Sequence, residues 1–152
     1  MKALLAIDGS PSAAQALDLA CELLAGKEAE VTLLHVIPRH LIYGKGGPVV
    51  AECYDPQEER AHSVDLLETN AQLLKERGIG PTIKKELETG DPADLILAAA
   101  EEADVDLIIL GSRGLSTVRR FMLGSVSTKV ASHAHCAVLV GHAKHVEAAV
   151  AQ

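Results

Sequence analysis

The stretch DLIILGSRGLSTVRRFMLGS, Asp106–Ser125, opens with an apolar run that predicts a buried strand. Gly111 and Gly114 follow the run and frame a turn, and nine residues separate Gly114 from Gly124. The next segment, Ser125–Ala134, predicts a helix. A strand, a glycine turn and a glycine at a helix start are typical of an anion-binding site, because main-chain amides and the helix N-terminus can then face the ligand.

The rest of the chain alternates strands with helices. Short apolar or β-branched runs predict strands at residues 3–7, 31–37, 82–88, 106–110 and 136–140. Helices are predicted after the Ser10–Pro11 start, over residues 57–77, after the Asp91–Pro92 start and over residues 125–134. This alternation predicts a single α/β domain over residues 1–152, an open parallel sheet with helices on both faces. The charged run 82–88 suits an edge strand and the apolar run 106–110 a central one.

Composition excludes several classes of protein. Of 152 residues, 48% are apolar, yet only two are Tyr and one is Phe, so Leu, Ile, Val and Ala must build the core. No run is long enough to span a bilayer or resembles a signal peptide, and three cysteines at wide spacing do not suggest a disulfide framework. We therefore expect a cytoplasmic protein without membrane insertion. The net charge of −7 argues against binding nucleic acid.

The charge distribution favours a small anion at the glycine turn. The chain holds 21 Asp and Glu residues, but none lies between Leu107 and Val146. The same stretch carries five basic residues, namely Arg113, Arg119, Arg120, Lys129 and Lys144. We interpret Arg113 as a phosphate contact from its charge, and Arg119 and Arg120 as solvated side chains.

Two strand ends carry loops suited to a ligand. Asp8 follows the first strand and the Gly111–Gly114 turn follows the fourth, so both face one crevice if these strands are neighbours. Glycines permit positive φ and a close approach of amides to an anion. Gly124 and Ser125 would add free amides and a helix dipole, which together suit a polyphosphate. Asp8 suits a ribose hydroxyl or water around Mg²⁺.

Three segments of the chain resemble the universal stress protein family. They are AIDGSPSAAQAL, GDPADLILAAAEEADVDLIILGSRG and LGSVSTKVASHAHCAVLV, and the likeness covers residues 1–140 except the loop 39–56. The glycines fit the Gly-x2-Gly-x9-Gly-Ser/Thr pattern that marks the ATP-binding branch. The resemblance implies an adenine nucleotide α-hydrolase-like fold with sheet order 3-2-1-4-5. It also implies bound ATP, or AMP or ADP, with Mg²⁺ held through the phosphates.

The resemblance implies a role for each residue of the crevice. Ala6, Val36 and Leu110 would border the adenine, and Asp8 would hold the ribose or an associated metal. The phosphates would meet one group of residues from one side and a second group from the other. The first group is Gly111 and Gly114, to which we add Arg113 for its charge, since it stands at a variable position of the family pattern. The second group is Gly124, Ser125 and Val126.

The family likeness also implies a homodimer. The strand Ala137–Val140 would form an apolar edge, and pairing with the same strand of a second copy would cover it. The alternative is cover by the tail 142–152. The loop 39–56 is expected to be irregular, and it could act as a lid over the base.

Three functions remain open from the sequence. The first is an ATP-holding regulatory module that governs association with an unknown protein partner, and the second is a slow Mg²⁺-dependent ATPase. The third is a nucleotide-free, chaperone-like member of the family. No P-loop, dinucleotide fingerprint or catalytic triad is present, so we expect at most weak ATP hydrolysis. The histidines near Cys136 lack the spacing of a zinc site, and no metal ligands are predicted.

Overall fold

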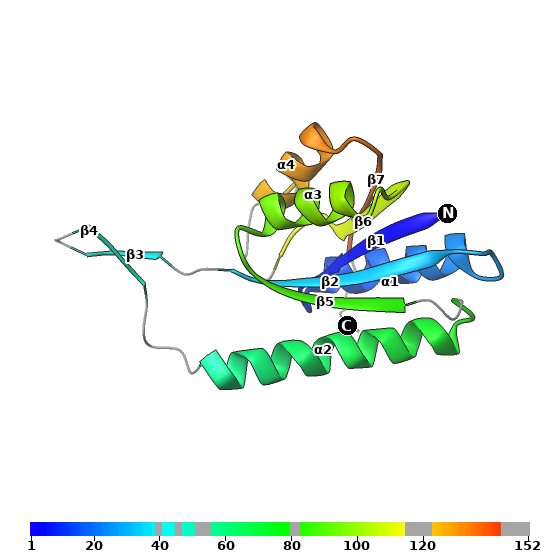
Figure 1. The fold of residues 1–152 in the computed structure, drawn as a ribbon, viewed down its shortest axis with the longest axis horizontal. Helices are drawn as coiled ribbons and strands as arrows, with labels where there is room; N and C mark the ends of the chain where they lie inside the picture. Colours follow the sequence, from blue (N-terminus) through cyan, green and yellow to red (C-terminus); the bar gives the residue numbers. More distant parts are fainter. Residues whose placement is uncertain (39–40, 45–46, 51–55, 80–82, 115–122, 144–152) are drawn as a thin grey trace, which may run out of the picture.

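The protein is an open, five-stranded parallel sheet with helices on both faces (Figure 1). The computed structural model describes residues 1–38, 41–44, 47–50, 56–79, 83–114 and 123–143. The sheet order is β5-β2-β1-β6-β7, and every neighbouring pair is parallel. The strands are β1 (Lys2–Ile7), β2 (Glu30–Pro38), β5 (Ile83–Gly90), β6 (Leu107–Gly111) and β7 (Ala137–Gly141). In chain order within this sheet the arrangement is 3-2-1-4-5, which confirms the predicted fold.

Two helices cover each face of the sheet. On one face lie α1 (Pro11–Leu24) and α2 (Pro56–Glu76), and on the other α3 (Pro92–Glu102) and α4 (Ser125–His133). The strands alternate their side chains between the two layers, so Leu33 belongs to the core beneath α1 and α2 and Leu34 to the core beneath α3 and α4. Both leucines are fully buried. The core is thus aliphatic on both faces, as the composition predicts.

The helix starts follow the cap residues read from the sequence. The Ser10 hydroxyl accepts a hydrogen bond from the Ala13 amide, and Pro11 occupies the first helical position of α1. In α3, the Asp91 carboxylate accepts from the Asp94 amide at 3.0 Å. These caps place the N-termini of α1 and α3 directly after strands β1 and β5, at the carboxyl edge of the sheet.

The segment 39–56 differs from the irregular loop that the sequence predicts. It contains β3 (Leu41–Gly44) and β4 (Gly47–Val50), which pair antiparallel as a separate two-stranded sheet. Figure 1 shows this hairpin apart from the main sheet. Gly44 and Gly47 stand at the strand ends and face each other across the ladder, and Pro48 pairs with Tyr43. The predicted role of this loop as a lid depends in part on residues 39–40, 45–46 and 51–55, which lie outside the residues that the structure describes.

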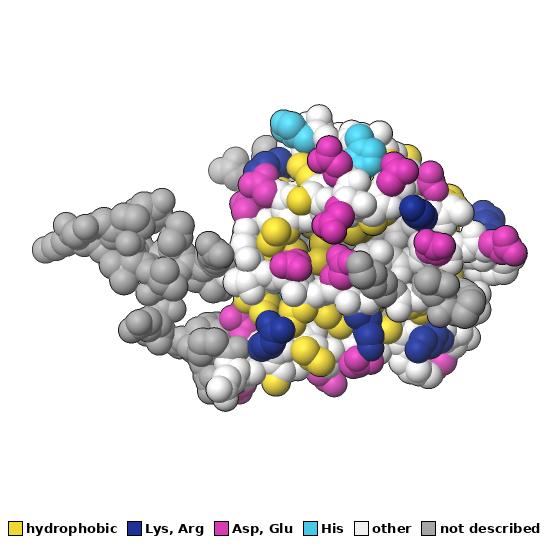
Figure 2. Space-filling model, in the orientation of Figure 1, with side chains coloured by type: hydrophobic (Ala, Val, Ile, Leu, Met, Phe, Trp, Pro, Cys, Tyr) yellow, Lys and Arg dark blue, Asp and Glu magenta, His cyan; other side chains and the backbone are white. Residues whose placement is uncertain are grey.

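The two edges of the main sheet differ in chemistry. The edge strand β5 carries charged residues, as predicted. At the other edge, Val138, Leu139 and Val140 of β7 are only half-buried. Acidic side chains are spread over the face seen in Figure 2 rather than gathered in one patch. Among the described helices, none combines the length and hydropathy needed to cross a membrane.

Candidate functional site

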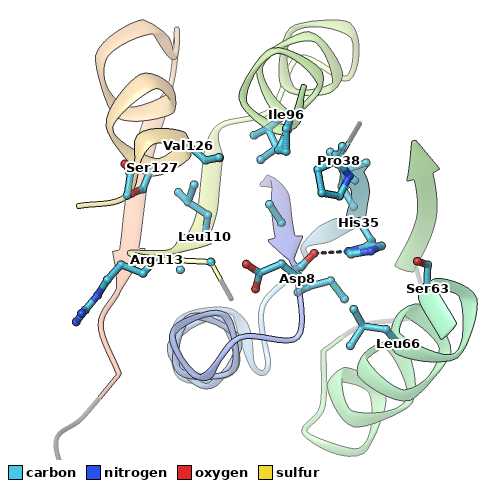
Figure 3. Close-up of a pocket in the computed structure, with 18 of the residues that line it drawn as sticks. Asp8, His35, Pro38, Ser63, Leu66, Ile96, Leu110, Arg113, Val126 and Ser127 are labelled. Carbon is cyan, nitrogen blue, oxygen red and sulfur yellow. Dashed lines mark hydrogen bonds between the residues drawn. The ribbon is translucent and has the colours of Figure 1, made fainter. Parts of the chain in front are cut away.

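A cavity of about 1020 Å³ opens at the carboxyl ends of β1, β2 and β6 (Figure 3). This is the edge at which parallel α/β sheets bind ligands, beside the point where the winding reverses. The structure brings together all ten residues predicted from the sequence, and each lines this cavity. They are Ala6, Asp8, Val36, Leu110, Gly111, Arg113, Gly114, Gly124, Ser125 and Val126.

Asp8 lies at the centre of the crevice, directly after β1 (Figure 3). Its Oδ1 accepts a hydrogen bond from the Ser10 amide at 2.9 Å, which orients the carboxylate. Gly114 faces the other oxygen, since a Cβ built on Gly114 would lie 3.0 Å from Asp8 Oδ2. The two loops predicted to share a crevice are therefore in contact, because β1 and β6 are neighbours in the sheet.

The four main-chain polar groups of Ser112 and Arg113 all bond within the protein. The Ser112 amide donates to Gly141 O at 2.7 Å, and Ser112 O accepts from the Gly124 amide at 2.7 Å and from Ser127 Oγ at 2.9 Å. The Arg113 amide donates to Ser12 Oγ at 3.2 Å, and Arg113 O accepts from the hydroxyls of Ser10 and Ser12. This dipeptide is a fixed support, and its amides are not available to an anion.

The structure corrects two expectations about the glycines of the site. The Gly124 amide is not free, because it donates to Ser112 O. None of the three site glycines has a positive φ, a conformation found among the described glycines at Gly9, Gly26 and Gly78. A side chain is excluded at Gly111 for packing, since its Cβ would lie 2.6 Å from both the Ala13 amide nitrogen and Ser12 Oγ.

Among the helices at the crevice whose N-cap the structure describes, namely α1, α3 and α4, only α4 lacks a side-chain cap. In α1 the Ser10 side chain caps the helix, and in α3 the Asp91 side chain does so. In α4 the N-cap is Gly124, which has no side chain to accept from the first amides. The Ser125 and Val126 amides of α4 therefore belong to the orphan donors of a helix start, and both residues line the cavity. These donors are suited to an anion.

An apolar slot adjoins these donors on the side of α3 and α4. It is formed by Leu34 and Val36 from β2, Leu110 from β6, Ile96 from α3 and Val126 from α4, all packed in one core cluster. Figure 3 shows Ile96, Val126 and Leu110 turned toward the cavity. Such a surface accepts a flat, weakly polar group, and fixed polar atoms at its rim can orient that group.

The cavity also has a wall on the α2 side that sequence reasoning missed. His35, Ser63 and Leu66 line it, together with Glu58, Glu59 and His62. The His35 Nδ1 lies 2.7 Å from Ile7 O, so Nδ1 carries the proton and Nε2 is the acceptor in the neutral ring. The sequence feature that could have indicated His35 is the alternation along β2, which turns His35 to the opposite face from Val36 at the same strand end.

Of the two described basic residues in the acid-free stretch, Arg113 lines the cavity and Lys129 does not. Lys129 bridges α4 to α3, with Nζ 2.6 Å from Asp94 and 3.6 Å from Asp91. The Asp94 hydrogen bond raises the pKa of Lys129, while the Asp94 amide, more than Lys129, lowers the pKa of Asp91. The Arg113 side chain extends away from Asp8 (Figure 3). Arg119, Arg120 and Lys144 lie outside the described residues.

The histidines and cysteines do not converge on a metal in the described part of the chain. No group of three His, Cys, Asp or Glu side chains with metal-binding geometry occurs there. The His133 ring instead bonds to Lys129 O at 2.9 Å. Cys21 is buried in the core and Cys136 is partly buried, and burial raises the pKa of both thiols. Cys53 and His145 fall on residues that the structure does not describe.

The fold and the site together define a doubly wound α/β domain with a ligand crevice at the carboxyl edge of its sheet. The family model of the universal stress protein family matches residues 1–142, and the chain belongs to this family. Among curated relatives, the universal stress protein YxiE of Bacillus subtilis (strain 168) is 36% identical over 148 residues. That match covers 91% of this chain and 97% of the relative.

Solved structures agree with this assignment. The universal stress protein UspA from Lactobacillus plantarum superposes with a TM-score of 0.77 at 26% identity, covering 93% of this chain and 97% of its own. A universal stress protein solved in complex with cAMP gives a TM-score of 0.69 at 26% identity, covering 95% and 98%. A family protein from Arabidopsis thaliana with AMP bound shares the fold, with a TM-score of 0.66 at 24% identity, covering 97% and 94%. One relative of this chain, at 26% identity, is thus known with cAMP bound.

Proposed function

We propose that this protein is an ATP-binding universal stress protein, a cytoplasmic regulatory module whose nucleotide state governs its association with a protein partner. The observation that carries the proposal is the uncapped N-terminus of α4. Its first residues, Ser125 and Val126, line the same cavity as Gly114 and Asp8, beside an apolar slot. A helix N-terminus without a side-chain cap binds phosphate through its amides and its dipole.

The chemistry of the cavity suits the parts of an adenine nucleotide. The apolar slot of Leu110, Ile96 and Val126 suits the base, with Ala6 and Val36 at the strand ends beside it. Asp8 Oδ2 is available to a ribose hydroxyl, since Oδ1 is already held by Ser10. Gly114, Ser125 and Val126 suit the phosphates, with Mg²⁺ bound through them. Gly111 and Gly124 support this end of the site through packing and the Ser112 bond.

The relatives solved with cAMP and AMP support an adenine nucleotide as the class of ligand. The spacing of Gly111, Gly114, Gly124 and Ser125 favours a triphosphate among these, because it matches the pattern of the ATP-binding branch. The tightest binding is therefore expected for ATP, followed by ADP, AMP and adenosine.

The test is isothermal titration of the purified protein with ATP, ADP, AMP and adenosine, each with and without Mg²⁺. Mass analysis of small molecules released from acid-quenched protein supplies an independent reading of the resident nucleotide. We expect nucleotide to co-purify largely intact and ATP to bind more tightly than adenosine. Absence of binding by all four ligands would contradict the proposal and favour the nucleotide-free, chaperone-like alternative.

A slow ATPase is the second candidate, because Asp8 places a carboxylate oxygen opposite Gly114 at the phosphate end. This activity would appear as steady phosphate release that requires Mg²⁺ and disappears in Asp8→Ala while the variant stays folded. Under the regulatory proposal, turnover is negligible and Asp8→Ala changes affinity alone. The two functions are therefore separated by phosphate release from the wild-type protein.

We also propose a homodimer through β7. This strand forms an edge of the sheet, and its side chains Val138, Leu139 and Val140 are apolar and half-buried. Pairing with β7 of a second copy would cover the outer edge of this strand, with which no other described strand pairs. The alternative cover, the tail 142–152, lies mostly outside the described residues. Light scattering should give twice the chain mass of 16.0 kDa, and a lysine at the exposed Ala137 should shift the equilibrium toward the monomer. A monomeric wild-type protein would contradict the dimer but not nucleotide binding.

A further inference from the structure

Ser12 makes an unusual pair of contacts with the loop that follows β6. Its hydroxyl accepts from the Arg113 amide at 3.2 Å and donates to the carbonyl oxygen of the same residue. Ser10 Oγ supports the arrangement, at 3.1 Å from Arg113 O and 3.2 Å from Ser12 Oγ. Both serines are buried, with 4% and 1% of their surface exposed. The start of α1 thus holds residue 113 at both of its main-chain polar groups.

The bond to Arg113 O has a consequence for the next residue. The carbonyl of Arg113 and the amide of Gly114 belong to one peptide unit, which is planar and trans, and the described chain contains no cis peptide. In such a unit the C=O and N–H point in opposite directions. Because two serine hydroxyls hold the carbonyl toward α1, the Gly114 amide is turned away from α1, and Gly114 lines the cavity.

We infer that Ser12 is a positioning residue for phosphate binding, which sets the direction of the Gly114 amide without touching the ligand. The inference rests on the proposed function and deepens it. A hydroxyl that contacts only the main chain of residue 113 can affect the phosphate end of the site while leaving the apolar slot intact. Ser12 does not line the cavity, so we expect it to act on the phosphate through the position of Gly114 and not by direct contact.

A second set of hydrogen bonds connects the start of α4, which carries the other phosphate donors, to the same Ser112–Arg113 segment. Ser127 Oγ lies 2.9 Å from Ser112 O and 3.1 Å from Gly124 O, and the Gly124 amide also bonds to Ser112 O. These bonds fix the start of α4 to Ser112, which is adjacent to Arg113, the residue that Ser12 holds. Loss of the Ser12 hydroxyl should disturb the alignment between Gly114 and the α4 amides.

The experiment compares ligands that differ in phosphate content. Wild type, Ser12→Ala and the control Ser132→Ala, which alters an exposed serine of α4, are titrated with ATP, inorganic tripolyphosphate and adenosine. We expect Ser12→Ala to weaken ATP and tripolyphosphate by about tenfold, the effect of losing one hydrogen bond to a charged group. Adenosine affinity should change by less than about twofold in the same variant, and Ser132→Ala should match wild type.

Two further variants keep the test decisive if Ser12→Ala fails to fold. Ser12→Thr retains the hydroxyl and should retain ATP affinity, whereas Ser12→Cys replaces it with a weak donor and should bind ATP as poorly as an alanine variant. Equal losses for ATP and adenosine, or ATP affinity unchanged in a folded Ser12→Ala or Ser12→Cys protein, would overturn the inference. Failure of the proposed function would be distinguishable, because the wild-type protein itself would then bind neither ATP nor tripolyphosphate.

Discussion

Asp8 and Gly114 face each other across the carboxyl edge of the sheet, and a Cβ on Gly114 would lie 3.0 Å from Asp8 Oδ2. They are separated by more than a hundred residues in the chain, yet Asp8 directly follows β1 and Gly114 lies three residues after the end of β6. These two strands are paired, with Ala6 opposite Leu110 in the register. The pairing of β1 with β6 therefore creates the site, and substitutions on either side of it should affect the same ligand.

A side chain at Gly114 should block the ligand without unfolding the domain. Gly114 is exposed, and the atom that its Cβ would meet is the end of the Asp8 side chain, which can shift. We expect Gly114→Val to reduce ATP affinity at least about a hundredfold, because the side chain would displace phosphate and remove close contacts. Its unfolding free energy should stay within about 1 kcal/mol of wild type, measured by urea unfolding beside calorimetry. Wild-type affinity in the folded variant would contradict this prediction.

A side chain at Gly111 should have the opposite profile. Its Cβ would meet main-chain atoms of α1, at 2.6 Å from the Ala13 nitrogen and 2.8 Å from the Ser12 carbonyl carbon. We expect Gly111→Ala to lower the unfolding free energy by about 1–3 kcal/mol through overpacking. Thermal unfolding of Gly111→Ala and Gly114→Ala measures the difference. Equal stability of the two alanine variants would show that α1 can move away without cost.

Removing the Ser112 hydroxyl should not destabilise the protein. Ser112 is 0% exposed, and its Oγ has no hydrogen-bond partner among the described residues. Because a buried, unsatisfied hydroxyl is unfavourable, Ser112→Ala should raise the unfolding free energy by up to about 1 kcal/mol. Ser127→Ala is the matched comparison, since that hydroxyl bonds to Ser112 O and its loss should cost about 1 kcal/mol. A loss of stability in Ser112→Ala would reveal a bonding partner for its hydroxyl.

Arg113 should act on the ligand through long-range charge rather than contact. Its side chain extends away from Asp8 in Figure 3. We expect Arg113→Gln to weaken ATP binding by about two- to fivefold at low salt, and this difference should vanish near 1 M salt, where the screening length falls to about 3 Å. Titration across a salt series measures the effect. A loss that persists at high salt would instead indicate direct contact with phosphate.

Stability at acid pH should depend in part on Asp91. The hydrogen bond from the Asp94 amide lowers the pKa of Asp91 below its ordinary value of 3.8. A lowered folded-state pKa means that the stabilisation is present above the ordinary pKa and is lost as pH falls through the folded value. Asp91→Asn keeps a capping oxygen but cannot titrate, so it should lose less stability than wild type between about pH 5 and pH 3. Parallel pH profiles of the two proteins in urea unfolding would contradict this.

The sequence predicts the fold because its local signals agree with the packing. Ser10 and Pro11 begin α1, Asp91 and Pro92 begin α3, and the apolar run 106–110 corresponds to an interior strand. The hairpin at 41–50 was missed, because its strands are only four residues long and end at glycines, which the sequence reading took for loop.

The site was predicted by position but only partly by chemistry. The glycine spacing and Asp8 locate the crevice, yet the sequence does not reveal which amides are already bonded. The Gly124 amide donates to Ser112 O, and Gly111 has to be glycine because Ser12 packs closely against it. Both features depend on tertiary contacts. His35 was missed because the alternation along β2 gives the face on which it lies, but not the position of α2, with which it forms the cavity wall.

Under the proposed function, the bare cap of α4 suggests how a nucleotide-binding domain of this kind could lose its ligand during evolution. Gly124 has φ −65° and ψ 163°, a conformation open to any residue, and an aspartate there could accept from the helix amides itself. Its Cβ would sit 3.3 Å from Ser112 O, a fit that requires a small local adjustment. Glycine and aspartate codons can differ by one base. A single point mutation could thus silence this domain as a receptor while leaving its architecture intact, a short path by which duplicated copies acquire nucleotide-independent roles.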